Sequence, residues 1–138
     1  MGKVYAEIEL INASDMANAR RHVSGEEEIR RTRVTMMADS GAYMMCINEN
    51  IQEQMGFDFV EHRPAQLAHG GIIECPVVGP IDVRFANRKA TCNAFVLPDD
   101  SEPLLGAIPM EEMDVLIHPS RHELIVNPKH PEAAVLRL

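Results

Sequence analysis

The sequence contains no tryptophan, and phenylalanine and tyrosine together make up only 4% of it. A hydrophobic core must therefore be aliphatic, built from valine, isoleucine, leucine and methionine. The hydrophobic fraction of 46% and the charged fraction of 25% are typical of a globular protein. The 138 residues contain no linker, repeat or low-complexity tract, so we expect one domain.

Features that would point to nucleic-acid or membrane partners are also missing. The formal net charge is −8, and the one basic cluster, Arg30-Arg31-Thr32-Arg33, lies just after Glu26-Glu27-Glu28. Binding to a phosphate backbone needs clustered cations without such acidic neighbours, so we expect no nucleic-acid partner. No apolar run approaches the ~20 residues of a membrane span, and the N-terminus has no signal-peptide pattern. We therefore expect no membrane partner and a cytoplasmic location.

The three cysteines are odd in number and show no short paired spacing. This pattern favours reduced, buried, structural thiols over a disulfide framework. A metal site could be built from scattered histidines together with the cysteines, but no CxxC pair is present, and histidines in loops are usually solvated. We expect no metal and no other cofactor. The residues considered were His62, His69, His118, His122, His130, Cys46, Cys75 and Cys92.

Short strands dominate the pattern along the chain. Alternating or continuous apolar residues, and hairpins with glycine or asparagine at their turns, predict strands over 3–12, 29–37, 42–47, 57–61, 66–78, 81–85, 90–97, 104–105, 114–118 and 123–126. Asn48 and Gly56 predict the two ends of a helix over 49–55, and Pro109 can stand in the first turn of a second helix over 108–112.

The segments between these elements are expected to be irregular. We predict a connector over 13–28 that could hold a short helical piece, a turn at Gly79-Pro80, and a loosely held tail from Pro128 onward. Seven or more short strands with two short helices indicate an all-β fold, a small closed barrel or a sandwich.

One carboxylate stands at the end of an apolar strand. Val34-Thr35-Met36-Met37 runs into Ala38 and then Asp39-Ser40-Gly41-Ala42. Glycine allows close backbone approach and serine can brace a tight loop. Asp-Ser-Gly is also an ordinary turn sequence, so this stretch alone does not establish a site.

In combination, the motifs resemble the retroviral-type (retropepsin-like) aspartic proteases, especially the bacterial single-domain members of that clan. The resemblance covers most of the chain, with a core over about residues 29–127. It rests on the order and spacing of Asp39-Ser40-Gly41-Ala42, the glycine hairpin at Gly70-Gly71, Leu104-Leu105-Gly106-Ala107-Ile108-Pro109 and Val115-Leu116-Ile117-His118-Pro119.

The resemblance implies a small closed barrel and a homodimeric aspartic endopeptidase acting on polypeptides. Asp39 would be the catalytic residue, supported by Ser40, Gly41 and Ala42. A flap over the substrate would be formed by His69, Gly70, Gly71 and Ile72. Packing under the loop would come from Leu104, Leu105, Gly106 and Ala107.

The single Asp-Ser-Gly is itself an argument for two copies of the chain. This type of peptide hydrolysis needs two carboxylates, and a two-fold dimer supplies the second one. Asp39 and its symmetry mate would then share one proton, because two like charges so close cannot both ionise. One carboxylate would activate a water and the other would polarise the scissile carbonyl. Ser40 is expected to brace the two loops across the two-fold axis.

Some residues depart from the family pattern. Tyr43 stands where serine or threonine is common, Ser40 replaces the commoner threonine, and the terminal strands of the viral dimer interface match only loosely. The methionines at 36–37 and 44–45 are interpreted as core filler. Two alternatives stay open: a dimeric binding or scaffolding module on the same fold, and a structural β-domain in which Asp-Ser-Gly is only a turn.

Overall fold

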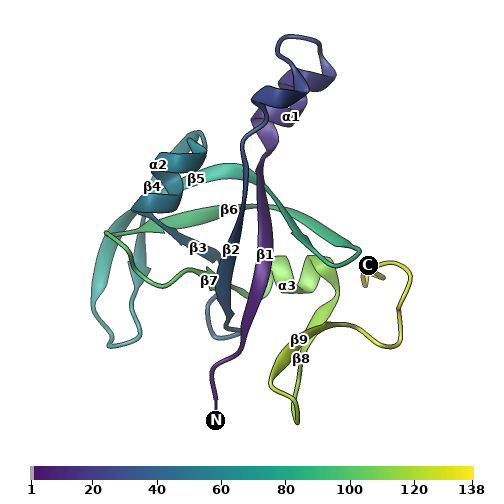
Figure 1. Ribbon diagram of the computed structural model, residues 1–138. Helices are drawn as coiled ribbons and strands as arrows, with labels where there is room; N and C mark the ends of the chain where they lie inside the picture. Colours follow the sequence, from purple (N-terminus) through teal and green to yellow (C-terminus); the bar gives the residue numbers. More distant parts are fainter. Residues whose placement is uncertain (1) are drawn as a thin grey trace.

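The computed structural model describes residues 2–138 and consists mainly of strands (Figure 1). The all-β character predicted from the sequence is confirmed. The strands are β1 (Tyr5–Asn12), β2 (Arg31–Ala38), β3 (Met45–Asn48), β4 (Phe59–Gln66), β5 (Ile72–Phe85), β6 (Arg88–Leu97), β7 (Leu104–Leu105), β8 (Val115–His118) and β9 (Glu123–Val126).

Three short α-helices and one 3-10 turn complete the described residues. They are α1 (Ala13–Arg20), η1 (Glu26–Glu28), α2 (Glu49–Met55) and α3 (Ala107–Met113). None of the helices in residues 2–138 has the length and apolar character needed to cross a lipid bilayer.

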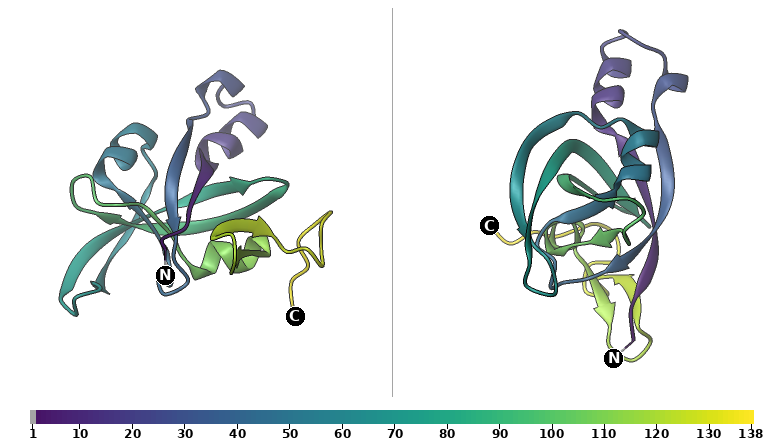
Figure 2. Two further views of the ribbon diagram at one scale, coloured as in Figure 1. Left: turned by 60° about the horizontal axis from the view of Figure 1, so that its bottom comes forward. Right: turned by 90° about the vertical axis from the view of Figure 1, so that its left-hand side faces the viewer.

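Seven strands form one mixed sheet in the order β1-β2-β7-β3-β6-β5-β4. β7 lies between β2 and β3, parallel to the first and antiparallel to the second. β1 also pairs with β5, so the sheet bends back on itself (Figure 2). β8 and β9 form a separate two-stranded sheet beside α3, at the lower right of Figure 1.

The core is aliphatic, as the scarcity of aromatic residues predicts. Ile8 and Leu10 of β1 are fully buried, and so are Met36, Met45 and Leu105 from the three strands that follow in the sheet. These side chains belong to one continuous cluster together with α3 residues such as Met113. The core therefore lies directly behind the point where β2 and β7 end and β3 begins.

The helix predicted over 49–55 is confirmed at both ends. The side chain of Asn48 accepts a hydrogen bond from the Ile51 N–H at 2.9 Å, and Gly56 ends the helix with φ of +56°. An asparagine N-cap and a left-handed glycine are the usual signals for the two ends of a helix.

Two strand boundaries predicted in the middle of the chain are wrong: the end of the strand over 57–61, which was expected before Pro64, and the turn at Gly79-Pro80. β4 continues through Pro64, which is possible because β4 is the edge strand and one side of it has no strand to pair with. β5 continues through Gly79-Pro80, where its pairing with β6 shifts register between Val78 and Ile81. A proline at a register shift removes no regular ladder bond, so the strand resumes beyond it.

The segment after β1 contains a helix where the sequence predicted a connector. α1 has no buried residue and extends away from the sheet at the top of Figure 1. The Asp15 carboxylate fixes it by accepting hydrogen bonds from the Arg30 N–H, Nε and Nη2, each at 2.9 Å. These bonds from Arg30 lower the pKa of Asp15. A helix without an apolar face leaves little periodicity to detect.

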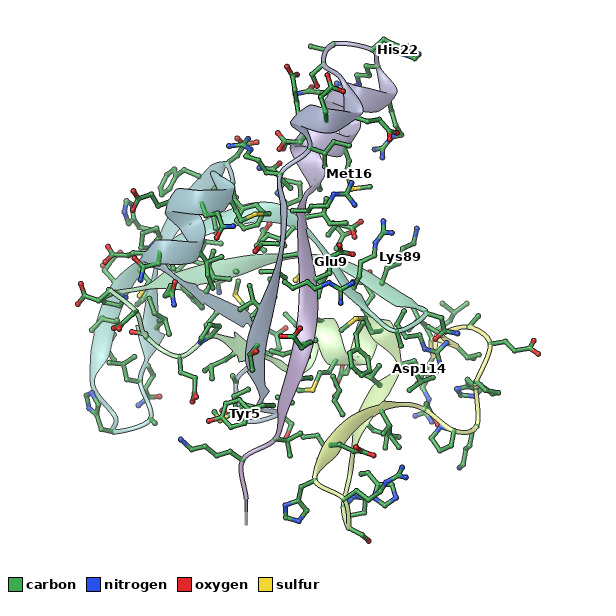
Figure 3. All side chains as sticks on the ribbon, in the orientation of Figure 1. Tyr5, Glu9, Met16, His22, Lys89 and Asp114 are labelled. Atoms are coloured by element: carbon green, nitrogen blue, oxygen red, sulfur yellow. The ribbon has the colours of Figure 1, made fainter. Side chains whose placement is uncertain are left out.

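The C-terminal segment is tied to the body of the protein, so the loosely held tail predicted from the sequence is wrong. Asp114 stands before β8 and accepts hydrogen bonds from the Asn127 amide (3.0 Å) and the Val135 N–H (3.1 Å), and its Oδ2 lies 2.7 Å from His130 Nδ1 (Figure 3). The buried Arg88 donates to the carbonyl oxygen of His130. No local pattern in the sequence signals these long-range bonds.

Asp114 is expected to make the attachment of this segment dependent on pH. The Asn127 amide, the Val135 N–H and His130 lower the pKa of Asp114 from 3.8 to about 2. Because the folded-state pKa is the lower one, this stabilisation is present above about pH 4 and is lost as the pH falls toward 2. Asp114→Asn should therefore lower the thermal midpoint at neutral pH and converge with wild type near pH 2. Asp100→Asn, at an exposed residue, is the control, and a difference that stays constant with pH would contradict the prediction.

Candidate active site

The loop after β2 carries Asp39 at the end of the buried part of the strand. The Asp39 N–H donates to the carbonyl oxygen of Leu105 at 3.0 Å, and the Ala42 N–H donates back to the Asp39 carbonyl at 3.1 Å. The carboxylate Oδ1 of Asp39 accepts a hydrogen bond from the Gly41 N–H at 2.9 Å. Asp39 is half-buried, while Ser40 and Gly41 are exposed. The loop thus presents one carboxylate at the surface on a backbone fixed from behind.

β7 and the start of α3 hold this loop from below, as expected for residues 104–107. Leu105 pairs with Ala38 in the parallel β2–β7 ladder and is fully buried. The Ala107 N–H donates to the Ala42 carbonyl at 2.8 Å, and the Ile108 N–H donates to the Tyr43 carbonyl at 3.0 Å. A segment distant in sequence therefore fixes both sides of the loop.

Gly106 lies where the backbone between β7 and α3 approaches the backbone after the Asp39 loop closely. A Cβ atom added there would lie 2.4 Å from the Met44 carbonyl oxygen and 2.9 Å from the Ala42 carbonyl oxygen. Both are backbone atoms, so neither can rotate away. The φ of Gly106 is −85°, which any residue can adopt, so glycine is required here by the close approach of the backbone alone.

The β4–β5 hairpin has its turn at residues 67–71, with the glycines where the sequence predicted them. The Leu67 N–H donates to the Gly71 carbonyl at 2.8 Å, and Gly70 has φ of +95°. His69 is exposed and accepts the Gly71 N–H on Nδ1 at 3.2 Å, and Ile72 is 69% exposed. The hairpin therefore projects an exposed tip from the sheet.

A cavity of about 460 Å³ lies between the Asp39 loop and this hairpin. Its lining is mostly apolar, with one carboxylate and one guanidinium. The lining residues are Asp39, Gly41, Ala42, Tyr43, Met44, Cys46, Arg63, Pro64, Ala65, Gln66, Leu67, Ala68, Phe95, Leu97 and Leu104. A cleft of this size and character can hold part of an extended peptide.

The cavity unites some of the predicted residues and leaves others outside. Asp39, Gly41, Ala42 and Leu104 line it, whereas the hairpin tip over 69–72 does not. The hairpin contributes instead through residues 63–66 of β4 and residues 67–68 at the start of the turn, which were not predicted from the sequence. The signal that could have indicated these lining residues is their position on the strand that leads into the glycine turn.

The methionines do not all fill the core as interpreted. Met36 and Met45 are fully buried, but Met44 is half-buried and lines the cavity, next to Tyr43 with 73% exposure. Residues 43 and 44 lie between the Asp39 loop and the start of β3, and their side chains line the cleft instead of packing in the core.

Cys46 also lines the cavity but is poorly suited to be a nucleophile. Burial is the main cause that raises its pKa to about 11, and the neighbouring Cys75 and Asp39 contribute to the same increase. Since the thiolate is the reactive form, this group is almost wholly protonated at neutral pH. Cys46, Cys75 and Cys92 are all free thiols, as their odd number favoured.

Within residues 2–138, no three histidine, cysteine or acidic side chains come together in a group that could hold a metal ion. His118 and His122 are four residues apart in the sequence. They lie at the β8–β9 turn, where His118 Nδ1 accepts the N–H groups of Ser120 (3.2 Å) and Arg121 (3.1 Å).

Another hollow, of about 590 Å³, lies between α3, the start of β8 and the C-terminal segment. It contains Glu111, Glu112 and Asp114 but none of the residues of the Asp39 loop. Asp114 is already engaged there by the C-terminal segment. The chemistry of a carboxylate on a fixed loop therefore belongs to the smaller cavity.

The chain matches no protein-family model, and no curated protein matches it in sequence.

Proposed function

We propose that the protein is a homodimeric aspartic endopeptidase of the retropepsin-like type. The observation that carries the proposal is the Asp39 carboxylate, held on a fixed loop in a mostly apolar cleft under a glycine-tipped hairpin. The parallel β2–β7 pair beneath the loop and the pairing of β1 with both β2 and β5 support the finer expectation of a small closed barrel.

A second copy of the chain is required because the cleft holds only half of the catalytic machinery. Asp39 is the one carboxylate among the lining residues of the cavity in the described part of the chain. Hydrolysis by this chemistry uses two carboxylates that share one proton. A two-fold axis beside the Asp39 loop supplies the second from the same surface of the partner.

The separate β8–β9 sheet supports such a dimer. Its two strands bond only to each other, and their residues are largely apolar: Val115, Leu116 and Ile117 in β8, and Leu124, Ile125 and Val126 in β9. Only Leu124 of these six is buried. An open strand edge of this kind can pair with the same edge of a second copy. This sheet and the hairpin tip extend in the same direction from the main sheet (Figure 1).

The mechanism then follows from the two carboxylates. The ionised one accepts a proton from water as the water oxygen attacks the scissile carbonyl carbon. The protonated one donates its proton to the carbonyl oxygen, which gives a neutral tetrahedral intermediate. The intermediate collapses as a proton passes to the leaving nitrogen, and the C–N bond breaks. The hairpin closes over the peptide and limits the access of bulk water.

Cleavage of a mixed peptide library between about pH 4 and 7 tests this proposal. We expect endopeptidase cuts, with a rate that rises more steeply than linearly with protein concentration below the dimer dissociation constant. The mass in solution should be that of two chains. A dimer without cleavage would favour the binding or scaffolding module, and a monomer at all concentrations would contradict the proposal.

A further inference from the structure

Arg63 is a cation of the cleft with no acidic partner. It lies on β4 and lines the same cavity as Asp39. Its Nη1 is 3.7 Å from the sulfur of Met44, another lining residue. Within residues 2–138, no carboxylate oxygen lies within 4 Å of the Arg63 guanidinium, whereas Arg30, Arg84 and Arg121 each pair with an acidic side chain.

The pairing of β4 with β5 shows which way Arg63 points. Arg63 stands opposite Cys75, and Ala65 stands opposite Ile73. Residues directly opposite each other in an antiparallel pair project from the same face of the sheet. Cys75 is buried, so Arg63 is on the inner face of the hairpin, toward the Asp39 loop. The contact with Met44, five residues after Asp39, agrees with this direction.

The rest of the cleft offers no other charge to a ligand. Besides Asp39 and Arg63, the lining includes Gln66 as its one polar amide, and most of the remainder is apolar. Arg63 is exposed, so its guanidinium can be reached by a ligand in the cleft, and it can bind a carboxylate through two parallel hydrogen bonds.

We propose that Arg63 is a specificity-determining residue that binds an acidic side chain of the substrate. The cleft would then select polypeptides in which aspartate or glutamate lies near the scissile bond, next to apolar residues that fill the remaining lining. The inference rests on the proposed endopeptidase function. In a two-fold dimer the combined cleft has an Arg63 at each end, so an acidic residue on either side of the scissile bond would be recognised.

A randomised peptide library separates this inference from the proteolytic function. Wild type is used for cleavage, and immobilised Asp39→Asn protein is used to capture peptides without turnover. We expect acidic residues to be enriched about tenfold over their amides in both the cleaved and the captured fractions. Arg63→Gln should abolish the enrichment, Arg63→Glu should shift it to lysine and arginine, and Arg63→Lys should retain part of it.

Arg33→Gln is the matched control, because Arg33 is an exposed arginine of β2 outside the cavity. It should leave the acidic enrichment unchanged, and the thermal midpoints of all variants should agree with wild type. Cleavage without acidic preference, or a preference that survives Arg63→Gln, would overturn the role of Arg63 alone. Acid-selective capture without cleavage would overturn the proteolytic function alone. Absence of both cleavage and capture would overturn both.

Discussion

Asp39→Asn is expected to reduce kcat/KM for peptide cleavage by about a thousandfold or more while leaving the fold and the dimer intact. An amide cannot accept the proton of the attacking water, and a dimer of the variant has an amide in both positions. The asparagine oxygen can still accept the Gly41 N–H that Oδ1 of Asp39 accepts at 2.9 Å, so the loop keeps its conformation. The measurement is the rate on a peptide that the wild type cleaves, together with the solution mass and the thermal midpoint.

Asp100→Asn provides the matched comparison, since it makes the same chemical change at an exposed residue in the turn before β7. Its kcat/KM should equal that of wild type. Mixing wild type with an excess of Asp39→Asn chains should also suppress activity, because most wild-type chains then pair with a chain that lacks the carboxylate. Undiminished cleavage by Asp39→Asn would show that another group performs the chemistry.

Gly106→Ala is expected to cost about 3 kcal/mol of the free energy of unfolding, the upper end of the range for overpacking a protein interior. The new methyl group would lie 2.4 Å from the Met44 carbonyl oxygen and 2.7 Å from its carbon. To relieve this, β7 must move away from the segment after the Asp39 loop. The bonds from Ala107 to Ala42 and from Ile108 to Tyr43 would then lengthen. Activity should fall together with stability.

Gly71→Ala is the control for this prediction. A Cβ atom at Gly71 would also meet one atom closer than 3 Å, at 2.5 Å, but this atom belongs to the exposed His69 ring, which can rotate away. Urea unfolding should show a change within about 1 kcal/mol for Gly71→Ala. Equal losses in the two variants would mean that the close approach beneath the Asp39 loop does not explain the requirement for glycine at 106.

The elements that the sequence predicted well are those whose signals are local. The helix over 49–55 has its own N-cap at Asn48 and its own stop at Gly56, and the hairpin turn at 67–71 has its glycines. The sequence allowed only a short helical piece somewhere in the connector over 13–28 and did not place α1, because this helix has no apolar face and depends on the pairing of Asp15 with Arg30, which is distant in sequence. The strand was expected to end before Pro64, but a proline is tolerated within β4 because β4 is an edge strand. Only the complete sheet determines which strand lies at the edge.

The same distinction applies to the site. Asp39 could be named because a strand running into Asp-Ser-Gly is a local motif. Arg63 could not, because its place in the cleft depends on the register of β4 against β5 and on the fold of the hairpin over the loop. The expectation for the tip residues followed the glycines, whereas the lining comes from the strand before them.

The hydrogen bond from the Asp39 N–H to the Leu105 carbonyl has a consequence for biosynthesis. The ribosome makes the loop that carries the carboxylate before β7, the strand that fixes this loop, and the strands β3 to β6 are made in between. β7 also brings α3 and the β8–β9 sheet after it. A nascent chain therefore carries Asp39 without the support that positions it. Under the proposed function, the ability to cut polypeptides arises only once β7 has been made and has paired with β2, which protects the growing chain and its ribosome-bound neighbours from premature hydrolysis.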